Sequence, residues 1–197
     1  MGGGQTWACA RLKTRGRIPM ILALAGRRVD AVDAKQQRFP AKNVDMVRER
    51  IRNLLQTQSA VTLVGSAACG ADLLALSEAS KLGLRSRVVL PYGREKFRTT
   101  SVTDRQGDWG PLYDKLLNEV EKSGDLIVIH ANSEDTAYGE TNQSILDEAL
   151  LLGRQLMDQV TAVLVWDGKS RGQVDVTEKF GIYARNKSIP VVEVMTL

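Results

Sequence analysis

The chain has 197 residues, of which 43% are hydrophobic and 25% are charged, values typical of a soluble globular protein with a full hydrophobic core. No apolar run approaches the roughly 18–20 residues of a membrane span, and residues 1–19 hold no apolar stretch of secretory-signal length. We therefore exclude a membrane-spanning protein and expect a cytoplasmic one.

The net charge of +4 comes from the N-terminal segment. Residues 1–19 hold no acidic side chain and four basic ones, namely Arg11, Lys13, Arg15 and Arg17. A basic surface is the usual mark of nucleic-acid binding, and the remainder of the chain is neutral. We expect a flexible basic tail over residues 1–19, a single domain over residues 20–197 and no nucleic-acid partner.

The two cysteines, Cys9 and Cys69, suit a reducing compartment better than a disulfide scaffold. No His, Cys and Asp residues stand at the spacing of metal ligands. We expect no bound metal.

Short hydrophobic runs alternate with helical patterns along the chain. The runs predict strands over Met20–Ala25, Val61–Val64, Arg87–Leu90, Asp125–Ile129, Thr161–Trp166 and Val191–Val194. The patterns between them predict helices over Val44–Gln56, Ala71–Leu82, Pro111–Lys122, Thr141–Met157 and Val174–Arg185. Continuously hydrophobic strands are typical of a parallel sheet that is buried on both faces. The alternation predicts an α/β protein with a three-layer, doubly wound, Rossmann-like fold and a mainly parallel sheet of about six strands.

Such folds bind ligands beyond the carboxyl ends of their strands, so the loops at those ends form the candidate site. The second strand runs into a loop of small residues, Gly65-Ser66-Ala67-Ala68-Cys69-Gly70, and a helix begins at Ala71. Small side chains let backbone N–H groups approach a phosphate, and a helix start favours an anion. We therefore predict a phosphate-binding loop here, in which Gly65 and Gly70 allow a close approach and Ser66 offers its hydroxyl.

Asp72 stands in the first turn of the helix that follows this loop. An acidic residue there stabilises the helix start. The same carboxylate could instead bind the hydroxyls of a ribose. Both interpretations remain open from the residues.

Basic side chains follow the first and third strands, namely Arg27, Arg28, Arg94, Lys96 and Arg98. Guanidinium groups suit phosphate or carboxylate binding, so these loops favour an anionic ligand. The segment from Tyr92 to Gly110 has little regular pattern, and loops of this length are usually functional. Within it, Phe97 and Trp109 could stack on a base or anchor the loop.

The fourth loop ends in Gly139-Glu140-Thr141-Asn142, where the fourth predicted helix begins. Glu140 could face the same cleft as the other loops. His130, the only histidine, is either an inert residue at the strand end or an acid–base group.

Three blocks, GSAACGADLLAL, RVVLPYGREKFRTTSV and TAVLVWDGK, resemble the SLOG superfamily. That Rossmann-like group includes LOG-type phosphoribohydrolases, DprA-type proteins and ion-channel sensor domains. The likeness is greatest to uncharacterised bacterial SLOG-like domains and covers about residues 20–195. Those domains carry G-H-x-x-D, S-A-A-C-G-A-D and L-P-F-x-x-x-x-F in order. In this chain the first motif reads Gly26-Arg27-Arg28-Val29-Asp30, so Arg27 replaces the usual histidine.

The resemblance implies a pocket for a nucleotide or a nucleotide derivative. Its predicted lining comprises Gly26–Arg28, Ser66–Asp72, Pro91–Arg98 and Gly139–Asn142, and thus includes Ala67, Arg94, Phe97 and Thr141. The LOG catalytic signature P-G-G-x-G-T-x-x-E is absent. Tyr138-Gly139-Glu140-Thr141-Asn142 is its nearest counterpart and lacks the double glycine, and Glu148 lies further along the helix.

Three functions fit these residues. The favoured one is binding or sensing of a nucleotide or an NAD-derived ligand, with no certain cofactor. The second is hydrolysis or transfer at a nucleotide N-glycosidic bond, with Glu140 or Asp72 as the carboxylate and Arg27 or Arg94 holding phosphate. The third is an interaction module with a vestigial pocket. Base rates and the family likeness also predict a homo-oligomer.

Overall fold

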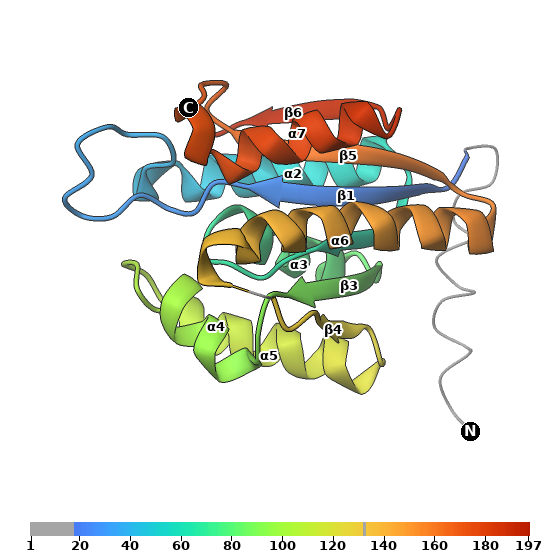
Figure 1. Ribbon diagram of the computed structural model, residues 1–197, viewed down its shortest axis with the longest axis horizontal. Coiled ribbons are helices and arrows are strands. Elements are labelled where there is room, and N and C mark those ends of the chain that lie inside the picture. Colours follow the sequence, from blue (N-terminus) through green and yellow to red (C-terminus); the bar gives the residue numbers. More distant parts are fainter. Residues whose placement is uncertain (1–17, 132) are drawn as a thin grey trace.

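The computed structural model describes residues 18–131 and 133–197 and contains a six-stranded sheet flanked by helices (Figure 1). Most of the predicted tail, residues 1–17, lies outside the described residues. The strands are β1 (Met20–Gly26), β2 (Ala60–Gly65), β3 (Arg85–Leu90), β4 (Leu126–Val128), β5 (Gln159–Trp166) and β6 (Val191–Met195). Each contains the core of one predicted hydrophobic run, so the strand predictions are confirmed.

All strand pairs are parallel, and the strand order is β4-β3-β2-β1-β5-β6. The chain moves outward from β1 to β4 and then returns to build β5 on the other side of β1. The topological switch point therefore lies between β1 and β5, which is where doubly wound sheets open a crevice for ligands. The predicted Rossmann-like α/β fold is confirmed.

The helices are α2 (Val44–Thr57), α3 (Ala71–Lys81), α4 (Arg94–Ser101), α5 (Trp109–Lys122), α6 (Glu134–Leu156) and α7 (Val176–Asn186), with 3-10 turns η1 (Ala41–Asn43) and η2 (Gly172–Val174). Helices α2, α3 and α5 cover one face of the sheet, and α6 and α7 cover the other (Figure 1). None of the helices in the described part of the chain is long and apolar enough to cross a membrane.

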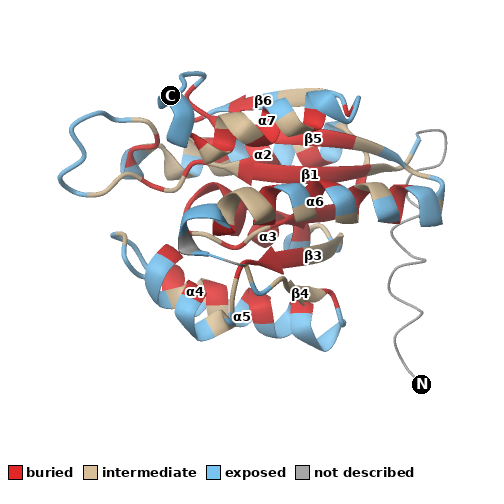
Figure 2. Cartoon of the chain, viewed as in Figure 1, coloured by how far each residue is buried: buried red, intermediate tan, exposed pale blue. Residues whose placement is uncertain are grey.

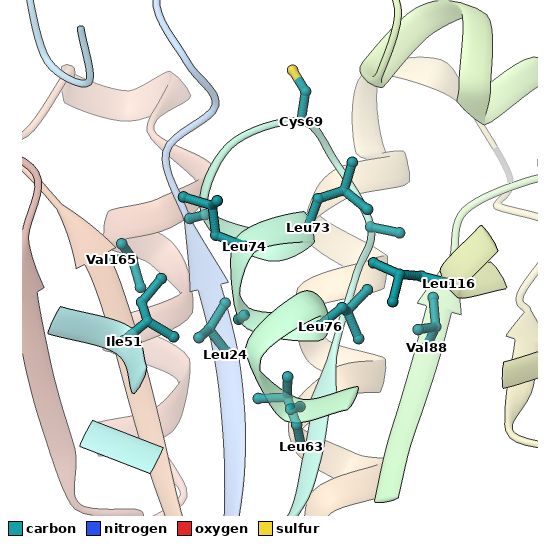
Figure 3. Close-up of a cluster of buried hydrophobic side chains, with 14 of the residues drawn as sticks. Leu24, Ile51, Leu63, Cys69, Leu73, Leu74, Leu76, Val88, Leu116 and Val165 are labelled. Carbon is teal, nitrogen blue, oxygen red and sulfur yellow. The ribbon is translucent and has the colours of Figure 1, made fainter. Parts of the chain in front are cut away.

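The sheet separates two hydrophobic cores because successive side chains of a strand point to opposite faces. On β1, Leu22 and Leu24 pack with α2, α3 and α5, whereas Ile21 and Ala23 pack with α6 and α7. Helix α3 lies at the centre of the first core and is buried along most of its length. It packs on the face of the sheet that carries Leu24, Val88 and Val165 (Figure 3). The strands β1 and β5 are buried over most of their length, which holds their carboxyl ends rigidly (Figure 2).

Two local predictions were wrong. Helix α4 lies inside the segment that we expected to be irregular, because its eight residues bury only Phe97 and Ser101 and leave no apolar stripe in the sequence. Helix α6 begins at Glu134 rather than at Thr141, since its added turns are mainly polar. The hydroxyl of Ser133 caps that start by accepting a hydrogen bond from the Thr136 amide. The predicted loop Gly139–Asn142 is therefore helical.

Candidate functional site

A cavity of about 550 Å³ opens at the carboxyl end of β1. Its walls come from the loops after β1 and β2, from the first turns of α6 and from the η2–α7 segment, which lie together at the left of the sheet in Figure 1. Because β2 and β5 flank β1 on opposite sides, the cavity spans the switch point, with one side built next to β2 and the other next to β5.

Two glycines allow the loops to pack this closely. A Cβ on Gly26 would lie 2.4 Å from the Cβ of Ala71, and one on Gly70 would lie 2.7 Å from the amide nitrogen of Val29. Gly70 also has a φ of +100°, which a glycine adopts without steric cost. The loop after β2 therefore sits directly on the loop after β1.

The close packing changes the role of the β2–α3 loop. Its amides at Cys69 and Ala71 donate to the carbonyl oxygens of Ser101 and Arg27, at 3.0 and 3.1 Å. The Ala68 amide donates to Oδ2 of Asp72 at 3.2 Å. Three of the N–H groups that we expected to face a phosphate are thus satisfied within the protein, one each by the first loop, by the end of α4 and by the side chain of Asp72. These three amides are therefore not available to a phosphate, and phosphate binding by the rest of the loop stays a prediction.

Three polar atoms at the β2 side of the cavity lack a partner. They are Nε of Arg28, Oγ of Ser66 and Oδ1 of Asp72, each buried and without a hydrogen bond among the described residues. All three residues line the cavity. An unsatisfied buried polar atom costs about 1–3 kcal/mol, so native proteins rarely keep one without a use for it.

Burial dominates the chemistry of Asp72, whose side chain is almost fully enclosed. Burial raises its pKa to about 7, and the Ala68 amide and the nearby Arg28 charge only partly oppose this shift. Asp72 can therefore hold a proton on its unpartnered oxygen near neutral pH. A ligand would meet a group able to donate or accept a hydrogen bond.

Arg28 joins the cavity to the loop before α5. Its Nη2 donates to Asp104, which also pairs with Arg105. Arg28 also lies beside the Cys69 thiol, whose pKa is raised by burial despite that positive charge. The thiol is consequently protonated and unsuited to act as a nucleophile.

The β5 side holds a buried ion cluster around Arg27. The two Nη atoms of Arg27 each lie 2.7 Å from an oxygen of Asp175, and its Nε lies 3.1 Å from Oδ1 of Asp167. Nη2 also donates to the Lys169 carbonyl at 2.7 Å, and the guanidinium lies over the Trp166 ring at 5.7 Å. Arg27, predicted to bind phosphate, instead ties the end of β1 to the loop after β5.

Asp175 is saturated with donors. Its oxygens accept the Arg27 fork and the backbone amides of Arg171, Thr177 and Glu178, and it thereby caps α7. Burial alone would raise the pKa of Asp175, but the bonds from Arg27 and these amides outweigh it and hold the pKa at about 2. The group remains a carboxylate over the physiological pH range.

Two further arginines stand beside this cluster and line the cavity. Arg38 pairs with Oδ2 of Asp167 at 2.8 Å. The Nε of Arg171 lies 3.7 Å from the already saturated Asp175, and its side chain is 44% exposed. Burial lowers the pKa of the Arg171 guanidinium, and the positive charges of Arg27 and Arg38 lower it further.

The other predicted site residues divide between the cavity and the scaffold. Gly26, Phe97, Thr141 and Asn142 line the cavity. The Asn142 amide donates to the Val176 carbonyl at 2.6 Å and so joins α6 to α7. The predicted residues that do not line it include Gly65, Ala67, Cys69, Gly70, Ala71, Pro91, Arg94, Gly139 and Glu140.

The basic residues predicted around α4 have acidic or aromatic partners on the scaffold. Arg94 donates a hydrogen bond to Asn118 at 2.9 Å and forms an ion pair with Glu121. Arg98 donates to both carboxylate oxygens of Asp114. Lys96 lies over the Tyr92 ring at 4.7 Å. These charges stabilise the packing of α4 on its surroundings.

The catalytic candidate Glu140 accepts a hydrogen bond from the Thr136 hydroxyl one turn earlier in α6, at 2.5 Å. Trp109, a stacking candidate, donates from its indole to the Gln106 carbonyl. Neither residue is among those that line the cavity.

Sequence reasoning missed several cavity residues, including Arg38, Tyr138, Arg105 and Arg171. The Tyr138 hydroxyl lies 2.8 Å from the Ser101 hydroxyl and 3.1 Å from that of Tyr92. Asp167 could have been found, because it directly follows β5 at the ligand-binding edge. Asp175 precedes a helical pattern, where an N-cap is expected.

In residues 18–131 and 133–197, no group of three or more His, Cys, Asp and Glu side chains is placed to hold a metal ion. A scan against protein-family models and a search of curated proteins found no match.

Among solved structures, the chain is similar to DNA processing protein A (DprA) from Streptococcus pneumoniae, at 12% identity and a TM-score of 0.38. That match covers 89% of this chain and 58% of the DprA chain. A second is Streptococcus suis SuiB bound to S-adenosylmethionine, at 11% identity and a TM-score of 0.26, covering 93% of this chain and 49% of the other. DprA-type proteins are among the groups named in the resemblance above. Neither likeness carries a ligand, an activity or a partner to this chain.

Proposed function

We propose that this protein binds, and thereby senses, a nucleotide or a nucleotide-derived ligand in the cavity at the switch point. The observation that carries the proposal is the set of three buried, unpartnered polar atoms on Arg28, Ser66 and Asp72. Their residues share one cavity, and a ligand with hydroxyl, carbonyl or amine groups would satisfy them.

The size and composition of the cavity support this ligand class. Its volume of about 550 Å³ falls within the roughly 300–1,000 Å³ of small-molecule sites. Apolar side chains such as Ile145, Val174 and Val176 stand among the polar ones and suit a planar base. Arg105 and Arg171 also line it, and guanidinium groups suit a phosphate.

A thermal-shift experiment tests the proposal. AMP, NAD, ADP-ribose and cyclic dinucleotides are added to the wild type, and a ligand at about 100 times its Kd adds ~2.7 kcal/mol of stability. We expect at least one of them to raise Tm by about 5–10 °C. Ser66→Ala should reduce that shift, whereas the control Ser80→Ala, on a hydroxyl that bonds Glu119 outside the cavity, should not. If the whole series leaves the wild-type Tm unchanged, the proposal is wrong.

A second candidate function is hydrolysis of a nucleotide N-glycosidic bond. The observation that favours it is the enclosed carboxyl of Asp72, with a pKa of about 7, because a general acid works best with a pKa near the operating pH. In this reaction Asp72 would protonate the departing base as the N-glycosidic bond breaks, and water would attack the anomeric carbon and return a proton to Asp72. The wild type incubated with AMP or NAD should then release base, measured by chromatography, and Asp72→Asn should not. If the wild type releases no base, the binding function stands alone.

A further inference from the structure

The cavity raises the question of which side takes the charged end of a nucleotide. The predicted place was the start of α3, yet the amides of Ala68, Cys69 and Ala71 are occupied by protein acceptors. The carboxyl of Asp72 also stands on this side. A phosphate here would meet the acidic Asp72, and the arginines on this side, Arg28 and Arg105, already pair with Asp104, so this side suits an uncharged polar group.

The opposite side carries surplus positive charge. Both carboxylate oxygens of Asp175 accept hydrogen bonds from Arg27, and they also accept three backbone amides. The Nε of Arg171 lies 3.7 Å from Asp175, and few lone pairs of that carboxylate remain for it. The neighbouring Arg27 and Arg38 are positive and lower the pKa of Arg171. Asp175 and Asp167 oppose this effect, but the three guanidinium groups of Arg27, Arg38 and Arg171 share these two carboxylates, so an incoming anion is favoured at Arg171.

The strand order separates these two sides. Ser66 and Asp72 follow β2, and Arg171 follows β5, with β1 lying between the two strands. A ligand that fills the cavity therefore has one end beside Ser66 and Asp72 and the other beside Arg171, at the partly exposed mouth.

We propose that Arg171 binds the phosphate of the nucleotide, while its uncharged polar end contacts Ser66 and Asp72. This orientation is opposite to the one expected from the glycine loop, and it rests on the proposed function. Arg171 becomes the residue that discriminates a phosphorylated from an unphosphorylated nucleoside. Arg27 is too fully engaged with Asp167 and Asp175 to do so.

Titration calorimetry with AMP, ADP-ribose and adenosine tests this orientation. In the wild type, both phosphorylated probes should bind more tightly than adenosine. Arg171→Ala should weaken AMP and ADP-ribose by about ten- to a hundredfold, the usual effect of removing a bond to a charged group, and leave adenosine within about twofold. Ser66→Ala should weaken all three probes and preserve their ratios.

Two variants guard against a structural explanation. Asp175 accepts the backbone amide of Arg171 and caps α7 through the amides of Thr177 and Glu178, so substituting the Arg171 side chain leaves these bonds intact. Arg171→Lys keeps the charge without the bidentate fork and should recover part of the AMP affinity. Arg154→Ala, an exposed arginine outside the cavity, should change nothing.

The outcomes separate the two proposals. If none of the probes binds the wild type, the proposed function fails and the orientation fails with it. If AMP binds but Arg171→Ala leaves the AMP-to-adenosine ratio unchanged, or weakens adenosine equally, only the orientation is wrong. The orientation is also wrong if the wild type binds adenosine as tightly as AMP.

Discussion

Arg27 and Arg28 are neighbours in the chain, line the same cavity and have different surroundings. Arg27 directs its guanidinium into Asp167, Asp175 and the Lys169 carbonyl. Arg28 pairs with Asp104 on one side and leaves its Nε buried without a partner. The β5 side of the cavity is therefore a satisfied ion cluster, and the β2 side is an unsatisfied polar surface.

The difference indicates that the Arg27 cluster is scaffold and that the polar atoms of Arg28, Ser66 and Asp72 are available to a ligand. A buried ion pair is stable only when its charges and remaining hydrogen bonds are matched, and the Arg27 cluster meets that condition. Unmatched buried atoms cost stability in the absence of a ligand. We expect substitutions in the Arg27 cluster, at Arg27, Asp167 or Asp175, to reduce folding stability, and Ser66→Ala on the β2 side to affect binding.

The largest loss of stability should come from a substitution that breaks the ion cluster around Arg27. Asp175→Ala leaves Arg27, 3% exposed, without its main counter-charge and removes the cap of α7. Such a change typically costs about 3–5 kcal/mol, measured as the free energy of unfolding in urea. The control Asp147→Ala removes an exposed pair with Lys187 and should cost less than about 1 kcal/mol. Equal losses in the two variants would contradict the scaffold role.

The next effect is a pH dependence of opposite sign on the two sides. The pKa of Asp72 is raised from 3.8 to about 7, so between these pH values the folded state keeps a proton that the unfolded state releases. The free energy of unfolding therefore falls as the pH rises from 3.8 to about 7, by about 1.4 kcal/mol per pH unit. The pKa of Asp175 is lowered from 3.8 to about 2, so its contribution is lost only as the pH falls below 3.8.

Urea unfolding of the wild type and of Asp72→Asn between pH 5 and pH 8 measures the Asp72 contribution. Relative to the variant, the wild type should gain stability as the pH is lowered. Parallel curves for the two proteins would show that Asp72 does not titrate in this range.

A smaller effect should follow from pushing the two loops apart. An alanine at Gly70 would be strained at φ +100° and would meet the Val29 amide at 2.7 Å, so Gly70→Ala should cost about 2–3 kcal/mol. Gly83 also has a positive φ but open space around it. Gly83→Ala should cost only about 1 kcal/mol. The difference between the two losses of unfolding free energy measures the contact between the loops after β1 and β2.

The smallest effect on stability should come from the unsatisfied side. Ser66→Ala removes a buried hydroxyl without a partner, so it should not lower the free energy of unfolding and should raise it by about 1 kcal/mol. The same variant should bind AMP about tenfold more weakly, because a hydrogen bond to the ligand is lost. A large loss of stability with unchanged AMP binding would reverse the assignment of the two sides.

Local patterns in the sequence were enough to predict the six strands, five of the helices and the edge of the sheet that holds the cavity. Continuous β-branched runs and helical apolar stripes mark the residues that are buried in the fold. This pattern can be recognised within each segment without knowledge of the others. The pattern could not reveal α4 or the first turns of α6, since these segments are polar and bury few side chains.

The roles within the site required the tertiary structure. Nothing local distinguishes Arg27 from Arg28, because the partner that engages Arg27 is Asp175, 148 positions away. The glycine loop likewise leads from β2 into α3 as expected, but its amides at Cys69 and Ala71 are occupied by the carbonyl oxygens of Ser101 and Arg27. Whether a charge or an amide remains available to a ligand depends on partners brought together only by folding, and spacing along the chain does not contain that information.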